Sequence, residues 1–178
     1  MEKTSGENSR IVILGPESTG KTTLCKELAL HYNAVWMPEY AREYVEKLKR
    51  PYTKEDVLHI ARKQIEKEEE YSKKSSLLFL DTDLIITKVW LLHVYKTCPN
   101  WIDESLKIAH RTHYLVCKPD LPWEFDPVRE NPELRDFLME WYCREIENYG
   151  YTFSFVSGTG KNRTNNAIQI LKGILSNG

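Results

Sequence analysis

Four residues near the start of the chain, Gly15, Gly20, Lys21 and Thr22, have the types and spacing that bind a nucleoside triphosphate. They fit the pattern G-x-x-x-x-G-K-[ST] in its required place, between a short apolar run and a helical pattern. The glycines let the backbone turn its N–H groups toward phosphate, and the helix start adds the positive end of its dipole. We expect Lys21 to reach the β- and γ-phosphates and the Thr22 hydroxyl to bind Mg²⁺.

The rest of the nucleotide site is predicted from the same loop and from a later glycine pair. Glu17 is expected to point away from the phosphates, and Thr23 is either a further loop hydroxyl or part of the first helical turn. The segment SGTGKNRTNN either forms a plain strand-to-helix turn or passes beside a flat base, with Arg163 near it. The predicted nucleotide contacts are Gly15, Glu17, Ser18, Thr19, Gly20, Lys21, Thr22, Thr23 and Arg163.

A carboxylate at the end of another central strand should accompany this loop. The segment LLFLDTD places Asp81 directly after four apolar residues. In P-loop NTPases such an Asp holds Mg²⁺, and ligands gather at the carboxyl edge of open α/β sheets. The alternative is that Asp81 caps the next helix, while Asp83 is either that cap or a contact to substrate. We therefore predict Thr22 and Asp81 as the metal ligands.

A further pair of charged residues follows the second predicted strand, in the segment VWMPEYAREY. Glu39 and Arg42 are three residues apart and share one face at the start of a helix. A carboxylate at this edge can accept the proton of an attacking hydroxyl or hold the hydroxyl groups of a sugar. The alternative is a charge at the helix start with an ordinary ion pair between the two residues.

Aromatic residues in the same region indicate a flat acceptor. Trp36, Tyr40 and Tyr44 belong to this segment, and Trp90 and Trp123 come from others. A flat cationic ring can stack between such side chains, although each ring alone can equally pack in the core. The predicted substrate contacts are Glu39, Tyr40, Arg42, Asp83, Trp90 and Trp123.

Residues 118–131 are long for a plain connection, and prolines lie in and beside them. Such loops are often lids. Closure would bring Arg129 or Arg135 onto the transferring phosphoryl group and expel water. The alternative is a surface loop whose arginines pair with nearby carboxylates. The predicted catalytic residues are Lys21, Glu39, Asp81 and Arg129.

Short apolar runs alternate with helical patterns along the chain, as in a parallel sheet covered on both faces. Strands are predicted at residues 11–14, 34–37, 77–80, 114–117 and 153–156. Helices are predicted at residues 21–32, 40–49, 54–73, 84–96, 102–109, 133–148 and 165–175, with Thr53 and Asp56 as a capping box. We expect a single α/β domain over residues 1–178, with residues 1–9 as a flexible tail.

The overall composition argues against several classes of protein. The 25 Lys and Arg nearly balance the 26 Asp and Glu, unlike a general nucleic-acid or membrane binder. The four cysteines form no C-x-x-C pair, so we expect reduced thiols rather than a metal or redox site. With no signal-peptide pattern and no apolar run near the ~20 residues of a membrane span, we expect a cytoplasmic protein.

Several segments together resemble the ribosylnicotinamide kinase domain of NadR-type proteins. They are GPESTGKTTL, PEYAREY, LDTD, PWEFDPVRENPELR and GTGKNRTNNAI, and the resemblance runs over residues 11–171. It implies the fold of P-loop nucleoside and nucleotide kinases. It also implies transfer of the γ-phosphate of ATP, with Mg²⁺, to the 5′-hydroxyl of nicotinamide riboside, giving nicotinamide mononucleotide in NAD salvage. By this resemblance Glu39 is the base or the ribose-binding carboxylate, Asp81 is the carboxylate after strand three, and Arg129 is a lid arginine.

The chain departs from longer members of that family, and two other hypotheses stay open. Those members carry an adenylyltransferase domain, and some a DNA-binding domain, ahead of the kinase. Only ~10 residues precede the first strand, too few for a domain, so we expect neither activity.

One other hypothesis is a kinase for another nucleoside or nucleoside monophosphate, although a monophosphate needs more basic residues beside Glu39 and Arg42. The second is a nucleotide-dependent switch, although the chain has no clear N-K-x-D guanine box.

Overall fold

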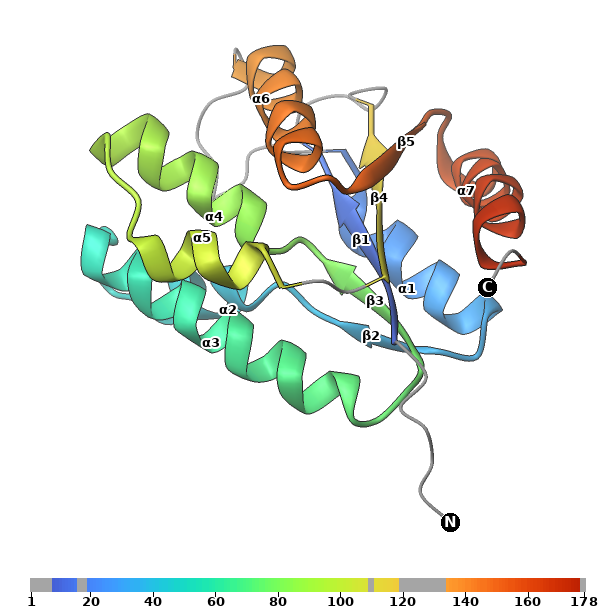
Figure 1. Cartoon of the computed structure of the whole chain (residues 1–178), viewed down its shortest axis with the longest axis horizontal. Coiled ribbons are helices and arrows are strands. Elements are labelled where there is room, and N and C mark those ends of the chain that lie inside the picture. Colours follow the sequence, from blue (N-terminus) through green and yellow to red (C-terminus); the bar gives the residue numbers. More distant parts are fainter. Residues whose placement is uncertain (1–7, 16–18, 109–110, 119–133, 177–178) are drawn as a thin grey trace.

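The computed structural model describes residues 8–15, 19–108, 111–118 and 134–176. Within these ranges the chain forms one sheet of five parallel strands, in the order β2-β3-β1-β4-β5 (Figure 1). The predicted five-stranded parallel sheet is therefore confirmed. The strands are β1 (Ser9–Leu14), β2 (Val35–Met37), β3 (Leu77–Asp81), β4 (Arg111–Cys117) and β5 (Thr152–Val156).

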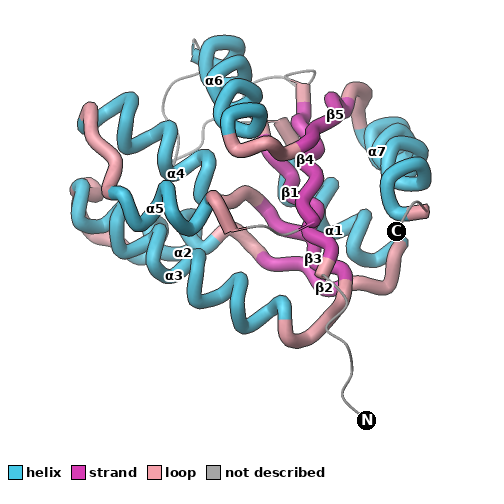
Figure 2. Tube along the Cα trace, in the orientation of Figure 1, coloured by secondary structure: helices cyan, strands magenta, loops and turns pink. Residues whose placement is uncertain are grey.

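Helices cover both faces of this sheet, as the cyan segments on either side of the magenta strands show (Figure 2). Helices α1 and α7 pack on one face, while α3, α4, α5 and α6 pack on the other. None of the described helices combines the length and the apolar character needed to cross a bilayer. The helices are α1 (Lys21–His31), α2 (Tyr40–Lys47), α3 (Lys54–Ser72), α4 (Leu84–Trp90), the π-helical η1 (Leu91–Tyr95), α5 (Asn100–Leu106), α6 (Arg135–Asn148) and α7 (Gly160–Leu175).

The central strand β1 shows why these segments form strands. Ile11 and Ile13 pack toward α1 and α7, whereas Val12 and Leu14 pack toward the helices of the other face. Each of the four is at most 1% exposed. Because successive side chains of a strand point to opposite faces, a strand covered on both sides needs a continuous apolar run. Because β1 is the middle strand of the five, Gly15, directly after it, lies at the middle of the sheet's carboxyl edge.

The predicted capping box fixes the start of α3. The N–H of Asp56 donates to Thr53 Oγ1 at 3.4 Å, and the N–H of Thr53 donates to the Asp56 carboxylate at 2.7 Å. Arg50 and Tyr44 donate to the same carboxylate at 2.6 and 2.8 Å. The hydrogen bond from Arg50, followed by that from the Thr53 backbone, holds the pKa of Asp56 well below its usual range. This cluster ties α2 to the start of α3.

Some predicted boundaries differ from the structure. β1 starts at Ser9, inside the predicted tail, because Ser9 pairs with Arg111 and extends the ladder beyond the apolar runs of both strands. The predicted helix 84–96 is two segments, α4 followed by η1. The last helix starts at Gly160, five residues earlier than predicted, because hydrogen bonds from the Arg163 side chain anchor its first turn.

Candidate active site

Three of the predicted site residues lie at the carboxyl edge of the sheet. Gly15 follows β1 directly, Asp81 is the last residue of β3, and Glu39 lies two residues after β2. The strand order β2-β3-β1 makes these three strands neighbours, and Asp81 is level with Ile13 of β1. Because parallel strands end at one edge, the loops that follow them converge there.

Gly15, the first residue of the phosphate loop, packs tightly against the end of a neighbouring strand. A side chain at Gly15, whose φ is +152°, would place its Cβ 2.8 Å from the carbonyl oxygen of Cys117 in β4. Gly20, with a φ of 73°, occupies the N-cap position of α1 in the left-handed conformation. Both positions therefore favour glycine. Lys21 follows as the buried first residue of α1, and Thr19 is also buried.

Thr22 and Asp81, the two predicted metal ligands, are in direct contact. The Thr22 hydroxyl donates to Asp81 Oδ2 at 2.6 Å, and Asp81 is 1% exposed. The capping role that the sequence left open belongs to Asp83, which accepts from the N–H of Ile85 at 2.9 Å. A hydroxyl beside a buried carboxylate fits Mg²⁺, which prefers oxygen ligands and commonly takes one or two carboxylates together with phosphate and water.

Glu39 and Arg42 lie on the side of the site predicted for the acceptor. Glu39 is 8% exposed and occupies the N-cap position of α2. Its Oε2 lies 3.9 Å from Arg42 Nη2, so the two form a long ion pair. The Arg42 side chain is 39% exposed. The carboxylate thus lies at the sheet edge where it can accept a proton or bind a sugar hydroxyl.

Tyr40 is predicted to contact the acceptor, and the structure places its ring between α2 and α3. Its hydroxyl lies 3.3 Å from His59 Nε2, and its ring centre lies 6.0 Å from that of Tyr44. The ammonium of Lys67 lies 4.9 Å from the centre of the Tyr40 ring. These contacts place Tyr40 in the packing between α2 and α3, and its contact with the acceptor stays a prediction.

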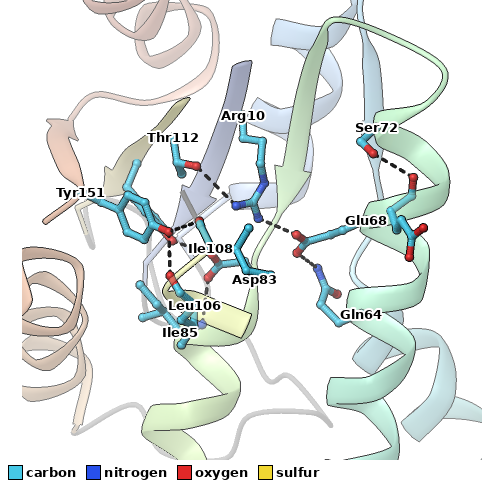
Figure 3. A network of polar contacts seen from close by, with 12 residues as sticks. Arg10, Gln64, Glu68, Ser72, Asp83, Ile85, Leu106, Ile108, Thr112 and Tyr151 are labelled. Atoms are coloured by element: carbon cyan, nitrogen blue, oxygen red, sulfur yellow. Dashed lines mark hydrogen bonds and ion pairs between the residues drawn. The ribbon is translucent and has the colours of Figure 1, made fainter. Parts of the chain in front are cut away.

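Asp83 lines a cavity of about 590 Å³ as well as capping α4. The Tyr114 hydroxyl donates to Asp83 Oδ2 at 2.7 Å. Figure 3 shows Arg10 of β1 and Glu68 of α3 pointing toward one another beside Asp83. Arg10 Nη2 donates to Glu68 Oε2 at 2.5 Å. The cavity extends toward the first residues of β1 and β3, since Arg10 and Leu78 line it. The structure therefore places Asp83 in an internal polar network.

Burial and the charged residues of this network shift the pKa of Asp83. Burial raises its pKa to about 6, and repulsion from Glu68 adds to the effect. The Arg10 guanidinium and the hydrogen bond from Tyr114 act in the opposite direction. In the unfolded chain the pKa of an Asp is about 3.9. The folded state therefore binds the Asp83 proton more tightly, so this group's contribution to stability falls as the pH rises from about 4 to about 6.

Asp83→Asn is expected to remove that pH dependence. Asparagine keeps the capping oxygen but carries no charge, so the free energy of unfolding of the variant should lose less than that of the parent as the pH rises from about 4 to about 7. Chemical unfolding between pH 4 and 7 measures the difference. Asp103→Asn is a control of opposite sign, because Lys107 and then Tyr149 lower the pKa of Asp103 to about 2. Equal pH profiles for Asp83→Asn and the parent would contradict the assignment.

The remaining predicted residues belong to several elements of the fold. Trp90 is half-buried at the end of α4, and its ring centre lies 6.0 Å from that of His93. Thr23 is exposed in the first turn of α1. Arg163 is 3% exposed and donates hydrogen bonds to backbone carbonyl groups. Four predicted residues lie outside the described residues: Glu17, Ser18, Trp123 and Arg129.

The sequence analysis missed the partners of Asp83. Arg10 directly precedes an apolar run and Tyr114 lies inside one, so hydrophobic patterns assign neither to a polar network. The available signal is the charge itself: an arginine at the start of a buried strand needs a counter-charge nearby. That signal does not identify Glu68, which is 58 residues away and belongs to a charged helix.

A comparison with protein families agrees with this geometry. The model of a family described as "AAA domain" matches residues 10–163. The chain belongs to this family. The AAA-domain match begins in β1, spans the phosphate loop and Asp81, and ends at Arg163.

Solved structures with the fold of this AAA-domain chain include two of NadR. NadR in complex with NR has a TM-score of 0.79 and 24% identity, covering 92% of this chain and 48% of that chain. NadR in complex with NAD and AMP-PNP has a TM-score of 0.77 and 23% identity, with the same coverage. The AAA-domain chain thus spans about half the length of these NadR chains.

Other solved structures are kinases of similar length to the AAA-domain chain. Thymidylate kinase from Ehrlichia chaffeensis has a TM-score of 0.64 and 13% identity, covering 94% of this chain and 99% of that chain. Deoxyadenosine kinase from M. mycoides has a TM-score of 0.66 and 12% identity, covering 92% and 99%. Together the structures confirm the predicted fold of P-loop nucleoside and nucleotide kinases. A search of curated proteins found no match.

Proposed function

We propose that the protein transfers the γ-phosphoryl group of ATP to the 5′-hydroxyl of nicotinamide riboside and releases nicotinamide mononucleotide, a step of NAD biosynthesis. The observation that supports this acceptor is the fold similarity. The two NadR structures reach TM-scores of 0.79 and 0.77, against 0.64 and 0.66 for the thymidylate and deoxyadenosine kinases. The glycine loop and the Thr22–Asp81 contact support the donor half.

The residues at the sheet edge have separate roles in this proposal. Lys21 neutralises charge on the β- and γ-phosphates. Thr22 and Asp81 would hold Mg²⁺, which supplies further charge neutralisation when bound. Glu39 accepts the proton of the 5′-hydroxyl while the bond from that oxygen to the γ-phosphorus forms. The bond between the γ-phosphorus and the bridging oxygen breaks, and ADP leaves with the bridging oxygen.

The proposal extends to parts of the chain beyond this edge. We propose that residues 1–178 act as a single kinase unit and that Arg129, from the predicted lid, stabilises the transferring phosphoryl group. The partner is a small molecule, and the proposal includes no nucleic acid or membrane. The cytoplasm is the proposed location, in keeping with four free cysteines.

A kinase for another nucleoside or nucleotide is the second candidate. The thymidylate and deoxyadenosine kinase structures favour it because they share the fold over 94% and 92% of this chain. Both candidates use the same phosphate loop and differ only in the acceptor, so the choice depends on acceptor-dependent turnover.

An acceptor panel separates the two candidates. The purified protein with ATP and Mg²⁺ receives nicotinamide riboside, thymidine, deoxyadenosine, uridine or AMP, and ADP release is compared with a reaction that lacks an acceptor. We expect kcat/KM to be highest for nicotinamide riboside, by at least about tenfold. Faster turnover of another acceptor would favour the second candidate. ATP hydrolysis that ignores every acceptor would contradict both.

A further inference from the structure

Arg163 is a buried arginine that joins three segments around the phosphate loop. It lies in the first turn of α7 and is 3% exposed. Its Nε–H donates to the carbonyl oxygen of Gly158 at 2.9 Å, and Nη2 donates to that of Lys118 at 2.9 Å. Nη1 donates to the carbonyl oxygen of Thr19 in the phosphate loop. One guanidinium thus connects the phosphate loop, the end of β4 and the turn after β5.

The fork shape of the guanidinium suits this set of contacts. Burying a charge is costly unless its donors are hydrogen-bonded, and here all three nitrogens of Arg163 donate to backbone oxygens. Arginine presents its donors in a rigid plane, whereas lysine presents three on one rotating ammonium. A single lysine nitrogen cannot reproduce the directions of three carbonyl groups on separate segments.

The contact with Thr19 fixes the direction of a peptide inside the phosphate loop. The carbonyl of Thr19 and the N–H of Gly20 belong to one planar peptide unit and point in opposite directions. Holding that carbonyl on Arg163 therefore fixes the N–H of Gly20, which is the residue directly before Lys21. Backbone N–H groups are what such a loop offers to phosphate.

The turn after β5 is built around Arg163. Gly158 has a φ of 94°, and a Cβ there would lie 3.3 Å from the backbone nitrogen of Arg163 and 3.2 Å from Asn166 Nδ2. Asn166 Nδ2 donates to the carbonyl oxygen of Ser157 at 3.0 Å. Gly158 therefore lets the backbone of this turn pass close to Arg163, and Asn166 holds the turn through its hydrogen bond to Ser157.

We infer that Arg163 is a positioning residue of the nucleotide site, which holds the Thr19–Gly20 peptide of the phosphate loop in its binding orientation through the Thr19 carbonyl. This inference deepens the proposed function but rests only on its nucleotide-binding half. This peptide should favour nucleotide binding because the N–H of Gly20 is already oriented before the ligand arrives. Replacing the guanidinium removes the hydrogen bond that holds this peptide, so nucleotide affinity should fall while acceptor affinity stays unchanged.

Nucleotide affinity of Arg163 variants tests the inference. AMP-PNP binding with Mg²⁺ is measured by calorimetry for the parent, Arg163→Met, Arg163→Lys and Lys172→Met. Lys172 is an exposed residue of the same helix, so it controls for loss of one positive charge. We expect Arg163→Met to weaken binding by about tenfold or more, Arg163→Lys to recover only part of it, and Lys172→Met to bind like the parent.

Two further readouts separate positioning from a role in stability alone. Thermal unfolding without ligand shows whether each variant is folded, and Arg163→Lys carries the test if Arg163→Met is not. Kinetically, KM for ATP should rise while KM for the acceptor stays constant. Folded Arg163 variants that bind AMP-PNP like the parent would overturn the inference, even with a lower unfolding temperature. Because AMP-PNP binding needs no acceptor, a wrong riboside assignment would leave this result intact.

Discussion

Lys21→Ala is expected to lower phosphorylation of the acceptor by about 10²–10³-fold or more. Lys21 is the buried first residue of α1, directly after the left-handed Gly20. It brings a positive charge to the phosphates from a site shielded from water, where charge stabilisation is strongest. Initial rates at saturating ATP and acceptor measure the loss.

A second lysine of the same helix provides the control for this result. Lys26 is exposed on α1, with its ammonium 5.2 Å from the centre of the Trp36 ring. Lys26→Ala should therefore keep near-parent rates, and circular dichroism should show both variants folded. A folded Lys21→Ala protein with more than about a tenth of the parent rate would contradict the role of this loop in transfer.

Glu39→Gln is expected to reduce turnover by about 10²–10⁴-fold, the usual effect of losing a general base. Glutamine keeps the shape of the side chain but removes the negative charge that accepts the proton. The measurement is kcat at saturating ATP and nicotinamide riboside. Glu46→Gln is the matched control, because Glu46 is an exposed carboxylate of the same helix α2.

The outcome for Glu39→Gln also distinguishes two functions of the carboxylate. A fall in kcat with little change in the acceptor KM would indicate a base, whereas a rise in acceptor KM alone would indicate a ribose contact. Near-parent kinetics would contradict both and would move the base to Asp81 or Asp83. Of those two, Asp81 lies at the sheet edge, whereas Asp83 accepts hydrogen bonds from Tyr114 and Ile85.

The parts of the fold that local chemistry dictates are predictable from the sequence. A strand buried on both faces needs an apolar run such as residues 11–14, and a phosphate loop needs Gly15 and Gly20 where the backbone turns sharply. Thr53 and Asp56 likewise form their predicted capping box. In each case neighbouring residues determine the structure, so one sequence segment contains the whole signal.

Contacts between distant segments are less predictable. The sequence suggests that Arg163 lies near a flat base or in a plain turn. In the structure its buried guanidinium donates to the carbonyl oxygen of Thr19, 144 residues away. The sequence allows Asp83 to be either a helix cap or a substrate contact, and it does not indicate the hydrogen bond from Tyr114, 31 residues away. The direction in which a side chain points depends on how several elements pack together, and a local sequence pattern does not predict that packing.

Tracing the γ-phosphoryl group tests the central claim most directly. The protein is incubated with γ-labelled ATP, Mg²⁺ and nicotinamide riboside, and the labelled products are separated and identified by mass. The account predicts that the label appears in nicotinamide mononucleotide in proportion to the ADP formed, and that Lys21→Ala abolishes this transfer. Label that appears only as inorganic phosphate, or unchanged ATP while another nucleoside is phosphorylated by the same protein, would contradict it.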